Sequence, residues 1–141
     1  MPKPAHTLAL ALVCVLTACG DTGASCPRFD GVYLASYDEL SGDCGALPAD
    51  LDTYDRDDPA PAIPADCTVR HMDASEDGCD VESDVECPTT FTDGTRGTVR
   101  RVVSAHKDGA ESAHGTLELR LAAGDGSRIC RSVYDVAITR R

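Results

Sequence analysis

Cysteine is the residue type with the most evident chemistry in this chain, which has eight of them in 141 residues. So many cysteines in a short chain are typical of proteins that fold in an oxidising compartment, where thiols pair as disulfides. Zinc sites use close pairs such as CxxC, and the sequence has none. We therefore predict disulfides rather than a metal cluster. The candidates, with Cys14 and Cys19 set aside for a reason given below, are Cys26, Cys44, Cys67, Cys79, Cys87 and Cys130.

A second candidate site is an acidic segment that partly matches the calcium-binding loop of an EF-hand. Asp73, Ser75 and Asp77 stand at loop positions 1, 3 and 5, Gly78 at position 6 and Asp84 at position 12. The match departs from the EF-hand at position 8, which is Asp, at position 12, which is not Glu, and in its strand-like flanks. The alternative is an acidic hairpin tip. We predict no cofactor, with Ca²⁺ at Asp73, Ser75, Asp77 and Asp84 as the one candidate.

Residues suited to catalysis do not form a recognisable motif. His106 and His114 fall near the tip of one predicted hairpin, in a register that does not place them directly opposite, and Ser104 and Ser112 are nearby. The sequence has no GxSxG nucleophile elbow, P-loop or dinucleotide fingerprint. We predict that the protein is not an enzyme. A small hydrolase using the region of His106 and His114 remains an alternative.

The charge of the chain excludes two classes of partner. Asp and Glu number 24 against 13 Lys and Arg, a net charge of −11. Nucleic acids and anionic lipid surfaces both bind basic faces, so we predict neither as an electrostatic partner. Residues 19–95 contain 19 acidic residues and three Arg, whereas residues 96–141 contain five acidic and nine basic residues. The later arginines either face an anionic partner or pair with the acidic first half. They include Arg96, Arg100, Arg101, Arg120, Arg128 and Arg131.

The N-terminus is predicted to be a targeting segment. Lys3 precedes an apolar run at residues 8–16. As a helix this run is about 14 Å long, against about 30 Å for the hydrocarbon core of a membrane, so it is typical of a signal peptide and not of a transmembrane helix.

The residues Leu-Thr-Ala-Cys-Gly at 16–20 follow the apolar run directly and resemble the lipobox of bacterial lipoproteins. This resemblance implies cleavage before Cys19 and acylation of Cys19 with diacylglyceryl and fatty acyl chains such as palmitate. Two or more chains make membrane attachment effectively permanent. Gly20 after the cysteine favours the outer membrane of the cell envelope, on its periplasmic or surface face. The alternative is an ordinary signal peptide that leaves Cys19 free.

The expected organisation is a signal peptide at 1–18, a lipidated tether at 19–25 and one β domain at 26–141. Asp-Gly turns at 77–78, 108–109 and 125–126 separate segments of alternating polarity. Residues 38–66 are acidic, rich in Pro and without periodicity, and we expect a long irregular loop there. The fold class is all-β: a small antiparallel meander barrel or curled sheet, stapled by disulfides. Its strands are expected at 29–37, 67–72, 79–87, 96–106, 112–121 and 128–139.

A pairing of the six cysteines follows if the first and last strands pair antiparallel and close a barrel. That pairing brings Cys44 near Cys130. Cys67 and Cys87 fall nearly opposite in the hairpin that turns at 77–78. Cys26 and Cys79 remain by elimination. Six cysteines allow 15 connectivities, of which this is one hypothesis.

This chain resembles small uncharacterised Cys-rich lipoproteins of myxobacteria. The resemblance rests on the lipobox, the Gly-Val-Tyr strand at 31–33, the Ser-Gly-Asp-Cys-Gly motif at 41–45, the Asp-Gly-Cys hairpin at 77–79 and the terminal strand at 130–140. This resemblance implies no activity. A likeness to lipocalin barrels rests on the Gly-x-Tyr strand alone. Three hypotheses result: a non-enzymatic envelope module that binds a partner or is structural, a ligand carrier with a lipocalin-like cavity, and a small hydrolase. The unknown partner is an envelope protein or a small ligand.

Overall fold

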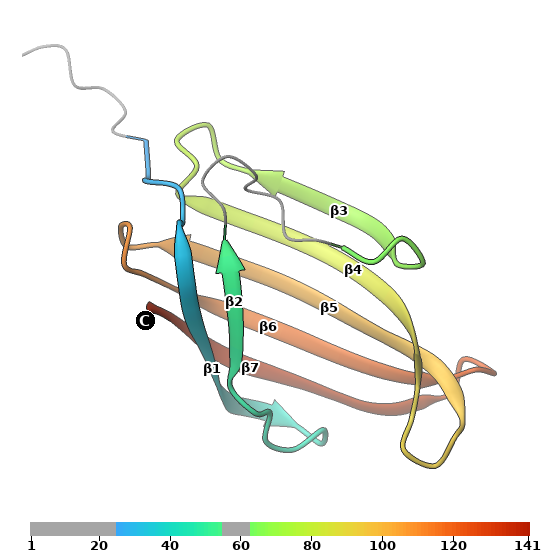
Figure 1. Ribbon diagram of the computed structural model, residues 1–141. Helices are drawn as coiled ribbons and strands as arrows, with labels where there is room; N and C mark the ends of the chain where they lie inside the picture. Colours follow the sequence, from blue (N-terminus) through green and yellow to red (C-terminus); the bar gives the residue numbers. More distant parts are fainter. Residues whose placement is uncertain (1–24, 55–62) are drawn as a thin grey trace, which may run out of the picture.

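The chain forms seven antiparallel strands in the computed structural model, which describes residues 25–54 and 63–141 (Figure 1). The strands are β1 Gly31–Gly42, β2 Asp50–Tyr54, β3 Thr68–Ala74, β4 Asp80–Thr90, β5 Arg96–Lys107, β6 Ser112–Ala123 and β7 Arg128–Arg140. The described residues form no helix, and therefore they contain no helix that is long and apolar enough to cross a membrane. The predicted all-β class is confirmed.

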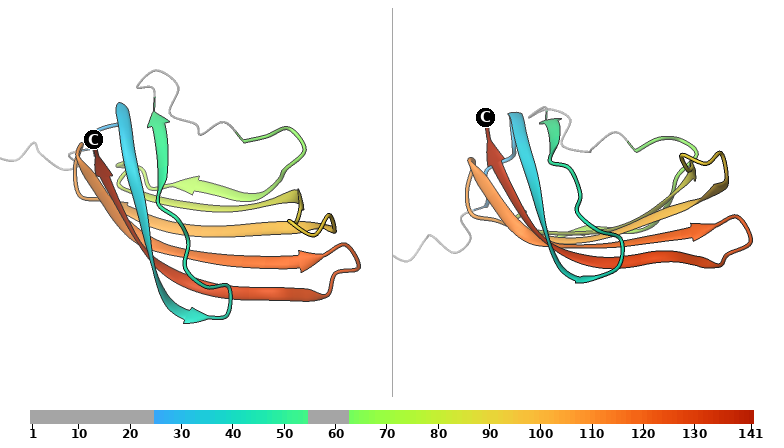
Figure 2. Two further views of the ribbon diagram at one scale, coloured as in Figure 1. Left: turned by 60° about the horizontal axis from the view of Figure 1, so that its bottom comes forward. Right: turned by 90° about the horizontal axis from the view of Figure 1, so that it is seen from below.

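The strands form one sheet in the order β2-β1-β7-β6-β5-β4-β3. The first predicted strand does pair with the last, as β1 with β7. The barrel nevertheless stays open, because β2 occupies the other edge of β1 and leaves β2 and β3 as the two edges of the sheet. Figure 2 shows the sheet curled into a half-barrel. The curled-sheet alternative is therefore correct, and closure by β1 and β7 is wrong.

The predicted loop at 38–66 is also corrected by the structure. β1 continues through the first residues of this segment to Gly42, and β2 lies within it at Asp50–Tyr54. An edge strand needs only backbone hydrogen bonds to one neighbour, so its side chains can stay polar and exposed. Leu51, for example, is largely exposed. The absence of an apolar pattern therefore did not exclude a strand. Residues 55–62 of the predicted loop lie outside the described residues.

The predicted Asp-Gly turns are present, with positive φ angles of 70° at Gly78, 155° at Gly109 and 83° at Gly126. Glycine adopts such angles without the steric cost that other residues incur. The hairpin at Gly109 is longer than a two-residue turn, because the amide of Asp108 bonds the carbonyl of Ser112. This longer turn changes the register of β5 against β6.

The core covers only part of the inner face of the half-barrel. Leu117 and Leu119 of β6 pack with Tyr134 and Val136 of β7, as the alternation in these strands predicts. Around them lie the half-buried residues Tyr37, Cys44, Leu47, Val99, Val103, Leu121 and Ile138. A second cluster contains Phe29, Tyr33 and Ala113. The inner face is thus filled over β1, β7 and β6.

Three disulfides hold the domain: Cys26–Cys79, Cys44–Cys130 and Cys67–Cys87. These are the three pairs that the strand order predicts. Cys44 follows β1, and Cys130 begins β7, so the pairing of the two strands brings them together. Cys67–Cys87 joins the two ends of the β3–β4 hairpin. The prediction survives the failure of closure because it required only the β1–β7 and β3–β4 pairings.

Candidate functional site

A groove opens on the inner face over β3, β4 and β5, beside the filled part of the sheet. Because side chains alternate along a strand, odd-numbered residues of β4 and β5 point into it. Its floor includes Val81, Val85, Val99 and Val103, with Met72 of β3 at the side. The groove encloses about 1560 Å³. This is larger than the roughly 300–1,000 Å³ of usual small-molecule sites and is apolar along its floor.

One cation stands in the floor of this groove. Arg101 of β5 lies directly beside Val85 of β4 in the register of the sheet. Its side chain is exposed, and within the described parts of the chain it has no hydrogen bond or ion pair. The charge of Arg101 acts on Tyr37 of β1, whose hydroxyl donates to Asp50 at 3.3 Å. Burial, followed by the charge of Asp50, raises the pKa of Tyr37 to about 12. Tyr37 is therefore neutral at physiological pH.

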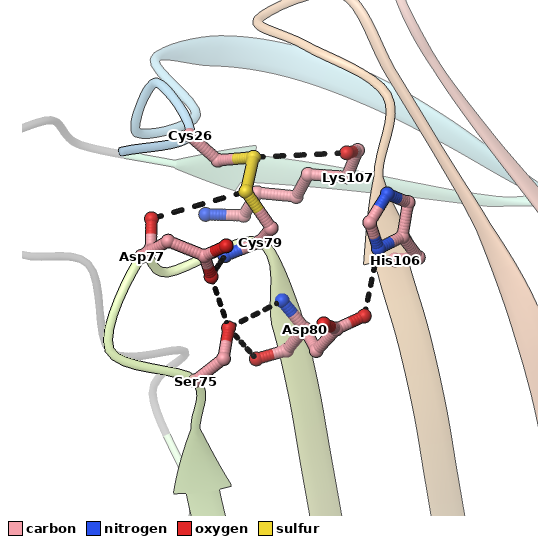
Figure 3. The surroundings of a disulfide bond; sticks show 7 residues. All are labelled: Cys26, Ser75, Asp77, Cys79, Asp80, His106 and Lys107. Carbon is pink, nitrogen blue, oxygen red and sulfur yellow. Dashed lines mark hydrogen bonds and ion pairs between the residues drawn. A yellow bond between two sulfur atoms is a disulfide. The ribbon is translucent and has the colours of Figure 1, made fainter. Parts of the chain in front are cut away.

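The end of the groove nearest the N-terminus is built around the Cys26–Cys79 disulfide (Figure 3). The amide of Cys26 donates to the carbonyl of Asp77 at 2.7 Å, which fixes the incoming chain against the β3–β4 turn. Lys107 holds its Nζ 5.2 Å from the centre of the Phe29 ring. Burial and the nearby charge of Arg28 lower the pKa of Lys107. Arg28 and Lys107 thus place two cationic side chains at this end.

The four predicted calcium ligands do not meet as one site: Ser75 and Asp77 lie together in the β3–β4 turn, but Asp84 lies apart from them. Asp77 accepts hydrogen bonds from the hydroxyl of Ser75 and from the amide of Cys79, which lower the pKa of its carboxyl. Asp84 lies on the outer face, where the guanidinium of Arg100 bonds both of its oxygens. Asp73 is paired with the outer-face residue Glu82, on the edge strand that borders the groove. Residues 25–54 and 63–141 contain no group of three or more His, Cys, Asp or Glu that could hold a metal ion.

The described histidines lie outside the groove, so the residues of the alternative hydrolase site are not next to the candidate binding site. His106 and His114 are paired directly across β5 and β6, and their ring centres are 5.6 Å apart. The prediction that they are not directly opposite is wrong, because the hairpin loop is longer than two residues. His71 of β3 also points outward, with Nε2 3.8 Å from Glu82. No histidine of the described residues lines the groove.

The arginines of the second half are used mainly for pairing within the protein. Arg100 pairs with Asp84, and Arg128 with Asp43, both acids of the first half. Arg120 and Arg131 instead share Glu118 of the second half. Pairing with the acidic first half therefore holds for Arg100 and Arg128. Arg101 faces the groove instead.

A polar network between β7 and the turn after β1 was not predicted from the sequence. Ser132 is 1% exposed; its hydroxyl donates to Glu39 and accepts the amide of Cys44 at 2.8 Å. The hydroxyl of Tyr134 donates to the carbonyl of Gly45 at 2.6 Å. These bonds fix the Ser-Gly-Asp-Cys-Gly turn against β7. The sequence analysis identified the motif, but nothing in the sequence indicated that Ser132, on the apolar face of β7, is its hydrogen-bond partner.

Comparison with known proteins adds no relative. No family model, curated protein or solved structure matches this chain. The function must be argued from the groove and from the sequence motifs. The predicted signal peptide and Cys19 lie outside the described residues, as does the tether up to residue 24.

Proposed function

We propose that this protein is a lipid-anchored envelope module that binds an amphiphilic ligand in its inner groove and catalyses no reaction. The observation that carries the proposal is the groove itself: a valine floor, open to solvent, with one unpartnered arginine in it. It favours the ligand-carrier hypothesis over a purely structural role, because a structural module has no need to leave part of its inner face uncovered.

The ligand we infer has a flexible apolar portion and one anionic group, as a fatty acid has. Covering aliphatic side chains such as Val85 and Val103 with an apolar chain is favourable by about 25 cal/mol for each Å² of apolar surface removed from water. The planar guanidinium of Arg101 can donate two parallel hydrogen bonds to the oxygens of one carboxylate or phosphate group. Arg28 and Lys107 add positive charge at the groove end. Carboxylates such as Glu76 and Asp77 line the same end, so the preference for an anionic head rests on Arg101 in the floor and not on the total charge of the groove.

The absence of a histidine in the described groove argues for binding rather than hydrolysis. A serine nucleophile needs a base within hydrogen-bond reach. Ser83 lines the groove and has no hydrogen bond to such a base among the described residues. Ser75 is held within the β3–β4 turn by Asp77 and Asp80, and Ser132 is buried away from the groove.

The binding proposal can be tested with three ligands that share a twelve-carbon chain and differ in their heads: dodecanoate, dodecanol and dodecyltrimethylammonium. Titration calorimetry would use the full chain carrying Cys19→Ala, below the micelle concentration of each ligand. We expect dodecanoate to bind most tightly. Arg101→Gln should weaken dodecanoate about ten-fold, the usual effect of losing a charge-assisted hydrogen bond, and leave dodecanol unchanged.

Arg96→Gln is the matched control, because Arg96 begins the same strand, is exposed on the outer face and has no ion pair in the described parts of the chain. It should bind all three ligands as the parent does. Equal binding of dodecanoate by the two arginine variants would contradict a role for Arg101. Failure of all three ligands to bind would contradict the groove as an amphiphile site.

The anchor is a separate part of the proposal and has its own test. In bacterial cells supplied with labelled palmitate, the chain should incorporate label and sediment with membranes. Cys19→Ala should abolish both. Cys14→Ala, within the apolar run, is the control and should retain both. Label that persists in Cys19→Ala would contradict acylation at this residue.

A further inference from the structure

The outer face carries a row of polar side chains near the β5–β6 turn. Asp80 of β4, His106 of β5 and His114 of β6 lie side by side in the register of the sheet. Both imidazoles are substantially exposed, at 48% and 63% of their side-chain surface. The row faces away from the groove, so it is independent of the proposed ligand site.

Each histidine is oriented by its own carboxylate. The ring of His106 faces the carboxylate of Asp80 (Figure 3), with Nδ1 2.7 Å from Oδ1. Nδ1 of His114 lies 2.9 Å from Asp108 Oδ2. Carboxylate–histidine pairs of this kind recur around protein metal sites. The carboxylate holds the ring in the tautomer with the proton on Nδ1 and leaves the lone pair on Nε2. Neither Nε2 has a hydrogen-bond partner among the described residues.

The spacing of the rings suits a shared metal ion. Two imidazoles bound to one tetrahedral ion at Zn–N distances of about 2.0–2.1 Å have ring centres about 5 Å apart. The observed separation is 5.6 Å, with a tilt of 54° between the rings. Exposed side chains can close such a difference by small rotations.

We propose that His106 and His114 form a two-histidine site for a divalent transition-metal ion of the zinc class, bound through both Nε2 atoms. Asp80 and Asp108 act as positioning residues, and water completes the coordination. The ion would join β5 to β6 near their turn. Imidazole nitrogen selects zinc, copper and nickel over calcium and magnesium, so this site differs in chemistry from the acidic loop considered above.

The test uses Zn²⁺ and the full chain with Cys14→Ala and Cys19→Ala, so that no unpaired thiol competes for metal. Calorimetry should show one site with a measurable affinity. His106→Gln and His114→Gln should each weaken it about ten-fold or more, and Asp80→Asn should weaken it less than either. His71→Gln is the matched control, because His71 is exposed on the same face and forms only a longer contact with Glu82.

A second measurement separates a folded site from binding by scattered side chains. Zn²⁺ that binds only the folded protein must raise its melting temperature. The rise should occur in the parent and in His71→Gln and disappear in His106→Gln and His114→Gln. Far-UV circular dichroism checks that each variant is folded. The proposal is overturned if Zn²⁺ does not bind, or if His71→Gln loses as much affinity as the two paired variants.

Discussion

Gly42 shows how closely the chain approaches itself at the turn after β1. Its φ is 126°, and a Cβ there would lie 2.2 Å from the hydroxyl oxygen of Ser132 and 2.3 Å from the carbonyl oxygen of Arg131. No side chain fits in this space. The glycine lets β1 and β7 meet where Ser132 bonds Glu39 and Cys44.

Gly42→Ala should therefore lower the free energy of unfolding by about 2–4 kcal/mol, because backbone strain and overpacking add. Urea unfolding with the disulfides intact measures this change. Gly126→Ala is the control: its φ is 83°, but no atom lies within 4 Å of the added Cβ. It should cost only about 1 kcal/mol. Equal losses in the two variants would show that the close approach contributes nothing.

Arg100 and Arg101 illustrate what can be predicted for single residues. Strand alternation predicts that they face opposite sides of the sheet. The sequence does not indicate which of them faces inward. That depends on where the apolar residues of β6 and β7 lie relative to β5, and thus on the register between strands.

At the scale of elements, the cross-strand ion pairs of the outer face link β6 to β7. Glu118 of β6 accepts hydrogen bonds from Arg120 of its own strand and Arg131 of β7. The bond from Arg120 is the main cause that lowers the pKa of Glu118, with Arg131 adding to it against the opposing effect of desolvation.

Folding lowers the pKa of Glu118 below its ordinary value of 4.5, so the ionised carboxylate stabilises the protein at every pH above 4.5. This stabilisation is lost as the pH falls through the pKa of the folded state. Glu118→Gln should therefore lower the free energy of unfolding by about 1 kcal/mol at pH 7. The difference from the parent should shrink steadily below pH 4.5. Chemical unfolding between pH 2.5 and 7 measures it.

Glu76→Gln, at the tip of the β3–β4 turn, is the control for this titration. Glu76 is exposed and has no ion pair in the described parts of the chain. Its substitution should leave stability nearly unchanged at every pH. A difference between parent and Glu118→Gln that stays constant across the range would rule out titration of Glu118 as its cause.

The elements themselves were mostly predictable because their signals are local. Leu117, Leu119 and Leu121 alternate with charged residues, and Asp-Gly turns mark the hairpins, so six of the seven strands could be predicted from the chain. β2 was missed because an exposed edge strand has no apolar pattern. The pairing of His106 with His114 was missed because one longer loop shifts a register, and loop length is not encoded by the Asp-Gly pair alone.

At the scale of the whole molecule, the disulfides compensate for a core with few large rings. The Cys44–Cys130 bridge spans 86 residues of sequence, whereas Cys67–Cys87 spans 20. A bridge that closes a longer loop removes more entropy from the unfolded chain.

Replacing both members of a pair by Ala should lower the free energy of unfolding by about 4–5 kcal/mol for Cys44 and Cys130 and by about 3 kcal/mol for Cys67 and Cys87. Urea unfolding under non-reducing conditions gives both values. The second double variant serves as the control for the first, since each removes two sulfur atoms and one bridge. A larger loss from the shorter loop would contradict the entropic explanation.

The sequence by itself determined the all-β class, the Asp-Gly turns and the inward faces of the core strands. It indicated the partners of the six cysteines only under the assumption that the first and last strands pair. It also supplies the lipobox motif on which the anchor proposal depends. The tertiary structure decided that the sheet stays open, because β2 takes the edge of β1 that a closed barrel would need. The groove over β3–β5, the inward direction of Arg101 and the His106–His114 pair all follow from that arrangement and its registers. These features depend on which strand edges meet across long stretches of chain, and local sequence patterns do not contain that information.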